Sequence, residues 1–270
     1  MNKVESYKEK ILSEKNLMDL MYESDDNYNK LTNYIDKFLY YKEQKDGIDI
    51  DVCKYNIFIY GTCYQSIKLS NTSLISKQGT CRNKYELSIE SENNKICYRG
   101  DTAINVLSLM KLVNIEDIKD KELFALMNDY AFLCYCVGNF YPIPFCFNDE
   151  ISCSLNLSKG TCKQNVLGKD ANKLFGDSMY VYLQFIYRLF EKYGGDWKKY
   201  IENNYFQPFV VKDDKNNFPI DFWKTDENNR IGILKKYLES INSALRERNK
   251  IILEKVEKIN SEHIINDILP

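Results

Sequence analysis

The segment VGNFYPIPFCFN, residues 137–148, constrains the fold more than any other part of the chain. Before it, over residues 123–134, apolar side chains recur at three- and four-residue steps, which is typical of a core helix. Gly138 offers that helix a stop, and Pro142 and Pro144 prevent a new helix from starting. The sequence therefore predicts a buried, extended segment that directly follows a core helix.

A buried extended segment must still satisfy its backbone N–H and C=O groups. Asn139 and Asn148 flank the aromatic part of the segment and can supply the partners. On a structural interpretation, these side chains only cap and staple the loop. On a functional interpretation, the segment lines a ligand site and the two amides orient the ligand.

The uncharged run over residues 130–147 is long enough to suggest a membrane span. Its two prolines, its Gly-Asn pair and its Tyr and Cys side chains favour burial in a protein core instead. The amino-terminal sequence MNKVESYKEKIL is charged and lacks the apolar centre of a signal peptide. We therefore expect a cytoplasmic protein without membrane association.

The composition is that of a globular protein, with 44% hydrophobic and 14% aromatic residues in 270 positions. That length suits a single domain over residues 1–270. The formal net charge of −2 argues against nucleic-acid binding across the whole surface.

The cysteine and histidine pattern excludes several kinds of site. The nine cysteines contain no C-x-x-C pair, and His263 is the only histidine. A Cys/His zinc site normally needs closely spaced cysteine pairs or several histidines, and a two-histidine metal site needs a second histidine, so neither fits this pattern. A Ser-His-Asp triad would have to use His263 alone, next to Glu262 near the end of the chain.

Periodicity along the chain predicts a mainly α-helical protein with a small antiparallel sheet, an α+β class. A helical pair is expected over residues 1–46, with helices at 4–22 and from about 26 to 44. A β insertion is expected over residues 50–98, with strands at 55–60, 85–90 and 96–98. Residues 99–270 form the helical core, and its last helix is expected at about 228–260.

A candidate site lies where the predicted sheet meets the helical core. Asp101 is placed to cap a helix from Thr102 to about residue 113, which also contains Asn105. Arg99 stands at the joint, where an anion could meet the helix amino terminus. The alternative is that Arg99 only pairs with Asp101.

Two further cationic residues are candidates for anion contacts. Arg248 falls on the apolar stripe of the last helix, and a buried guanidinium needs a carboxylate or a phosphate-like anion. It therefore serves either as a paired core residue or as a ligand contact. Lys159 lies in the polar, irregular segment 149–176, and a loop of that length is often functional.

Several pieces of the chain carry a resemblance to a known family. They are GNFYPIPFCFN, SLNLSKG, FGDSMYVYLQFIYRLFE, YGGDWKKYIENNYFQPFV, NFPIDFW and ALRERNKII, with RGDTAIN upstream. In this order they resemble a family of bacterial proteins known only as a domain of unknown function. The resemblance implies a cytosolic bacterial protein and no particular activity.

Three hypotheses about function follow. The first is a cofactor-free ligand-binding or regulatory module for a small anion, in bacterial phage defence or stress response. Its ligand contacts are Arg99, Asn105, Asn139, Asn148, Lys159 and Arg248. The second is a histidine-independent enzyme acting on nucleotides or nucleic acid, with Mg²⁺ held by Asp101, Asp129 and Asp177. The third is a structural, partner-binding helical protein.

Overall fold

The computed structural model describes residues 3–13, 16–44, 50, 53–63, 72–75, 86–90, 95–102, 106, 110, 113, 116–144, 197–210 and 230–259. Of residues 3, 4, 57, 61, 72–75, 86–90, 95–102, 142–144, 197, 200 and 230 it describes the backbone alone. The described part of the chain is mostly helical, so the predicted helical class is confirmed.

Four short helices replace the two that were predicted at the amino terminus. They are α1 (Lys3–Leu12), α2 (Leu17–Met21), α3 (Asp26–Asn29) and α4 (Tyr34–Glu43). Each break coincides with a side-chain cap, because Asn16, Asp25 and Asn33 accept bonds from the first backbone N–H groups of the helix that follows. Helical periodicity alone did not indicate these restarts.

The run of β-branched and aromatic residues at 55–60 is a helix, so the strand predicted there is wrong. Helix α5 (Lys54–Cys63) is buried on most of its surface, with Tyr55, Phe58, Ile59 and Tyr60 at most 1% exposed. An apolar run without alternation fits a buried helix as well as a buried strand. Burial on most sides, rather than on one face of a sheet, accompanies the helix here.

Four short strands pair in the order β1 (Thr72–Ile75), β2 (Glu86–Glu90), β3 (Lys95–Thr102) and β4 (Phe140–Pro144), and each pair is antiparallel. Strand β3 continues past residue 98, and Asp101 lies within it opposite Tyr141. Asp101 therefore does not cap a helix from Thr102, although Val106 and Met110 are helical. Strand β4 comes from the segment that the sequence assigned to the helical core.

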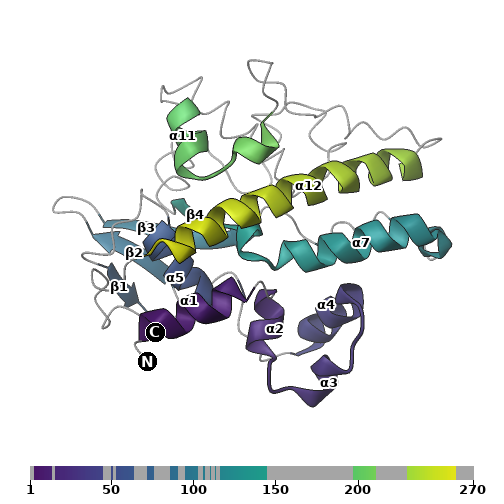
Figure 1. Ribbon diagram of the computed structural model, residues 1–270, viewed down its shortest axis with the longest axis horizontal. Helices are drawn as coiled ribbons and strands as arrows, with labels where there is room; N and C mark the ends of the chain where they lie inside the picture. Colours follow the sequence, from purple (N-terminus) through teal and green to yellow (C-terminus); the bar gives the residue numbers. More distant parts are fainter. Residues whose placement is uncertain are drawn as a thin grey trace.

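Two long helices, α7 (Lys121–Cys134) and α12 (Arg230–Glu257), lie side by side, and α12 agrees with the predicted last helix (Figure 1). The short helices η3 (Asp117–Lys119) and η4 (Val137–Asn139) flank α7. On another side of α12 lie α11 (Trp197–Asn203) and η6 (Gln207–Phe209) (Figure 1). Helix α12 thus touches η4 and η6, which are far apart in the sequence.

Candidate functional site

The candidate site is centred on Arg248, whose side chain is 0% exposed. The period of α12 explains this burial. Leu245, three residues before Arg248, and Ile252, four residues after it, are also buried, so the helix turns all three toward the core. The prediction that Arg248 lies inside the protein is confirmed.

The guanidinium of Arg248 donates to backbone carbonyls of two separate segments. Nε donates to the carbonyl oxygens of Asn204 and Tyr205 at 3.3 and 3.1 Å, and Nη2 donates to Asn204 at 3.1 Å. Nη1 donates to the carbonyl oxygens of Gly138 and of Phe140, the latter at 3.3 Å. Arg248 thereby joins α12 to the 137–144 segment and to the 204–206 turn.

The 204–206 turn is strained at the point where it meets Arg248. Tyr205 has φ 57°, the left-handed conformation that a residue with a Cβ rarely adopts. Its hydroxyl donates to the carbonyl oxygen of Cys63 at 2.5 Å, and the next ring, Phe206, stacks under the guanidinium with its centroid 4.6 Å from Cζ. This conformation costs about 1–2 kcal/mol, which the bonds from Arg248 to the turn help to offset.

Gly138 allows α12 to approach the segment closely. A Cβ at this position would lie 2.6 Å from the backbone nitrogen of Asn249, closer than real contacts allow. The backbone N–H of Gly138 donates to Oδ1 of Asn249 at 3.0 Å. Helix α7 has already ended at Cys134, so Gly138 is needed for this contact rather than as the helix stop that the sequence predicted.

Asn139 is buried and makes the local bond that the structural interpretation predicted. Its Nδ2 donates to the carbonyl oxygen of Cys134 at 2.8 Å, and its backbone N–H donates to the carbonyl oxygen of Cys136 at 3.0 Å. Both bonds bend the chain between α7 and β4. The side chain thus holds the segment in place, one residue from the carbonyl groups that Arg248 contacts.

The pairing of β3 with β4 brings a second candidate to this segment. Arg99 lies opposite Ile143 in the register, and Thr102 lies opposite Phe140. The backbone of residues 99–102 therefore runs beside the strand that Arg248 anchors. Asn105, Asn148, Lys159 and Asp177 lie outside the described residues.

Asp129, one of the three predicted metal ligands, forms an ion pair. Both carboxylate oxygens accept from Arg246 of α12, with Oδ2 2.7 Å from Nη1. Burial raises the pKa of Asp129, although the charge of Arg246 opposes the rise. Within the described ranges, no three His, Cys, Asp or Glu side chains are grouped so that they could hold a metal ion.

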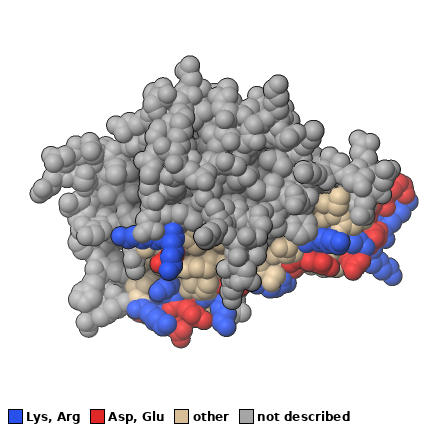
Figure 2. Space-filling view, turned by 90° about the horizontal axis from the view of Figure 1, so that it is seen from above, with Lys and Arg blue, Asp and Glu red and all other residues tan. Residues whose placement is uncertain are grey.

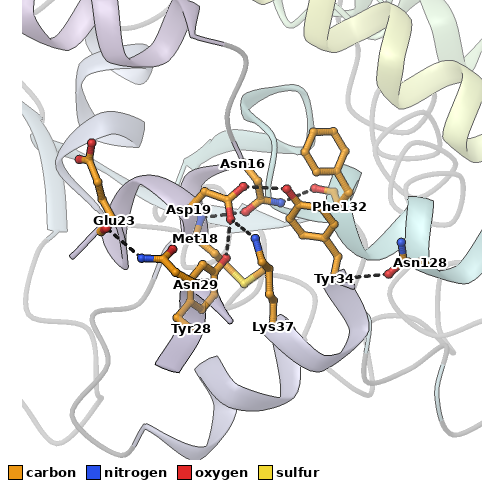
Figure 3. Close-up of polar contacts among 10 residues, drawn as sticks. All are labelled: Asn16, Met18, Asp19, Glu23, Tyr28, Asn29, Tyr34, Lys37, Asn128 and Phe132. Carbon is orange, nitrogen blue, oxygen red and sulfur yellow. Dashed lines mark hydrogen bonds and ion pairs between the residues drawn. The ribbon is translucent and has the colours of Figure 1, made fainter. Parts of the chain in front are cut away.

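Sequence reasoning missed a second polar cluster, in the amino-terminal helices. Asp19, Tyr28, Tyr34 and Lys37 converge from α2, α3 and α4 (Figure 3). The only local signal was the three-residue spacing of Tyr34 and Lys37, which places both on one face of a helix.

No protein-family model, curated protein or solved structure matches this chain. No helix in the part of the chain that the structure describes is both long and apolar enough to cross a lipid bilayer. In the strip of described residues that Figure 2 colours, basic and acidic side chains lie next to one another.

Proposed function

We propose that this protein is a cofactor-free ligand-binding or regulatory module that takes a small anion. The site is formed by β4 with η4, by the segment from residue 99 to residue 105, and by α12. Its contacts are those that the sequence singled out: Arg99, Asn105, Asn139, Asn148 and Lys159, with Arg248 as the buried residue that holds β4 in place. The small antiparallel sheet of the predicted α+β class supplies one wall of this site.

One observation carries the proposal, namely that the strand β4, which Arg248 holds through its backbone carbonyls, pairs with the backbone of Arg99 from a distant part of the chain. Arg248 donates to the carbonyl oxygens of Gly138 and Phe140, while Arg99 lies opposite Ile143. Three residues of extended chain separate Phe140 from Ile143, which is about 10 Å. The guanidinium of Arg248 is buried and donates to backbone carbonyls, so its role in this proposal is to position β4, while Arg99 is the cation that meets a small anion such as a nucleoside phosphate.

The enzyme hypothesis requires Mg²⁺ to displace an existing partner. Asp129 would have to release Arg246 before it could coordinate a metal, because both of its oxygens are in use. We therefore rank this hypothesis second.

The experiment is a thermal-shift screen with inorganic phosphate, nucleoside mono-, di- and triphosphates and dicarboxylates, each with and without MgCl₂. It compares the wild type with Arg99→Gln and with the matched control Lys119→Gln. Lys119 is a suitable control because its side chain is 70% exposed on η3. Arg248 is left intact, because its loss would unfold the site that is being tested.

We expect at least one anion to raise the melting temperature of the wild type by about 3 °C at ten times its dissociation constant. The rise should disappear in Arg99→Gln and persist in Lys119→Gln. A rise that survives in Arg99→Gln would refute the site. A rise that needs Mg²⁺ and is lost in Asp129→Asn would favour the enzyme hypothesis, and no rise with any anion would favour a structural, partner-binding protein.

The biological setting is part of the same proposal. The resemblance to a bacterial family suggests a cytoplasmic protein of bacterial origin. A role in phage defence or stress response is added to the proposal by association and does not follow from the resemblance. This setting rests on association, whereas the ligand class rests on the place of Arg99 beside β4.

A further inference from the structure

The Asp19 carboxylate is the centre of a compact polar cluster formed by three helices. Its Oδ1 accepts from the hydroxyl of Tyr28 at 2.9 Å and from Nζ of Lys37 at 2.7 Å. Its Oδ2 accepts from the hydroxyl of Tyr34 at 2.7 Å. Figure 3 shows the three side chains directed at this carboxylate, which leaves the ammonium of Lys37 between an anion and two aromatic rings.

The aromatic rings of this cluster contact the same ammonium. Nζ of Lys37 lies 4.8 Å from the ring centroid of Tyr28 and 4.6 Å from that of Tyr34. Both distances are within the range of cation–π attraction. Burial is the main cause that raises the pKa of both tyrosines, so both stay protonated and keep donating to Asp19.

The two tyrosine side chains of the cluster are held in place by contacts that do not involve Lys37. The backbone N–H of Tyr34 donates to Oδ1 of Asn128 at 2.7 Å, and its ring packs edge-on against Phe132, with centroids 4.8 Å apart. Tyr28 is 0% exposed and stacks on Tyr22 with centroids 5.1 Å apart. The arrangement should therefore persist when the lysine side chain is shortened.

We propose that Asp19, Tyr28 and Tyr34 form a binding site for a primary alkylammonium group, and that Lys37 of this chain is its resident occupant. The lysine and aspartate side chains are 15% and 18% exposed, so the site lies just below the surface. An outside amine enters as the Lys37 side chain withdraws. The wild type therefore binds such an amine more weakly than a variant whose lysine has been shortened.

The geometry selects a primary amine rather than a quaternary one. The bond of 2.7 Å from Nζ to Oδ1 needs an N–H donor, which a quaternary ammonium lacks. The carboxylate also requires a positive charge, so a neutral alcohol of the same size is a poor substitute. The shared chemistry is an ammonium on an alkyl stem, either as a free amine or as the lysine side chain of a peptide.

The experiment removes the resident occupant and supplies a replacement. Lys37→Ala deletes the atoms of a propylammonium group, so propylammonium is the matched probe. We expect it to raise the melting temperature of Lys37→Ala saturably, by about 3 °C at ten times its dissociation constant. The rise should be absent in Lys37→Met, whose stem fills the space, and much smaller in the wild type.

Further arms test the chemistry of the site. The double variant Asp19→Asn with Lys37→Ala should lose the rise, and 1-propanol and tetramethylammonium should not produce it in Lys37→Ala. N-acetyl-lysine methylamide distinguishes the two sources of the ligand, since a rise with this compound shows that a peptide lysine fits. An equal rise with 1-propanol, or an equal rise in Lys37→Met, would overturn the proposal.

A measurement on the wild type covers the case in which Lys37→Ala does not fold. The side-chain ammonium protons of Lys37 should exchange slowly with water in ¹⁵N-resolved NMR spectra, because they bond to Asp19 and face two rings. Those of Lys119 provide the exposed control. Exchange at the same rate for the two lysines would show that the site does not hold an ammonium group, and would refute the proposal.

Discussion

Replacing Arg248 by methionine should remove the contact that joins three parts of the fold. Methionine keeps an unbranched apolar stem of similar length but has no donor. The carbonyl oxygens of Gly138, Phe140, Asn204 and Tyr205 would then lose their bonds to the guanidinium in a buried setting. At about 1 kcal/mol for each of the four, the free energy of unfolding should fall by about 4 kcal/mol.

A graded series separates the donors of Arg248 from its charge. Arg248→Lys keeps the charge but replaces the planar fork with a single ammonium, so it should cost about half as much, about 2 kcal/mol. Arg246→Met is the matched control on the same helix. Its side chain is 56% exposed, so the loss of its ion pair with Asp129 should cost at most about 1 kcal/mol.

Urea denaturation followed by far-ultraviolet circular dichroism measures all three variants, because the described chain is mostly helical. The order of stability should be wild type, Arg246→Met, Arg248→Lys and then Arg248→Met. If Arg248→Met were no less stable than Arg246→Met, the carbonyl contacts would not hold the segments together, and the reasoning would be refuted.

Two other substitutions test the packing of α12 and the charge at the start of α7. Gly138→Ala should lower the free energy of unfolding by about 2–3 kcal/mol, because the added methyl group would lie 2.6 Å from the backbone nitrogen of Asn249. An unchanged midpoint of urea denaturation would contradict this close approach. Hydrogen bonds from Lys235 and from the backbone N–H groups of Leu123 and Glu122 lower the pKa of Asp120. The ionised carboxylate therefore contributes its full stabilisation of the folded state above the ordinary aspartate pKa, and this stabilisation is lost as pH falls through the lowered pKa. The stability difference between the wild type and Asp120→Asn should therefore vanish in acid, and a difference that did not change with pH would contradict this assignment.

Local features of the sequence predicted the long helices and the centre of the candidate site. The apolar period of α12 placed Arg248 on the inner face, and the structure confirms its burial. Pro142 and Pro144 predicted an extended segment, and both lie in β4. These predictions depend only on residue spacing and backbone geometry, which are local properties.

Non-local packing decided the features that the sequence misjudged. Residues 55–60 became a helix because they are covered on most sides, and no periodicity within six residues reports that environment. Asp101 lies in a strand because β4, some forty residues later, pairs with it. The Asp19 cluster needs three helices whose separate caps restart the chain in new directions.

The sequence by itself determined that the described part of the chain is mostly helical, that an arginine lies on the inner face of the last helix and that a proline-rich segment stays extended. Only the tertiary structure decided what that arginine contacts. Its described acceptors are backbone carbonyls of two other segments, and every residue has such carbonyls, so residue type cannot identify them. The close packing of α12 on Gly138 and the left-handed turn at Tyr205 accompany the four carbonyls that the guanidinium contacts.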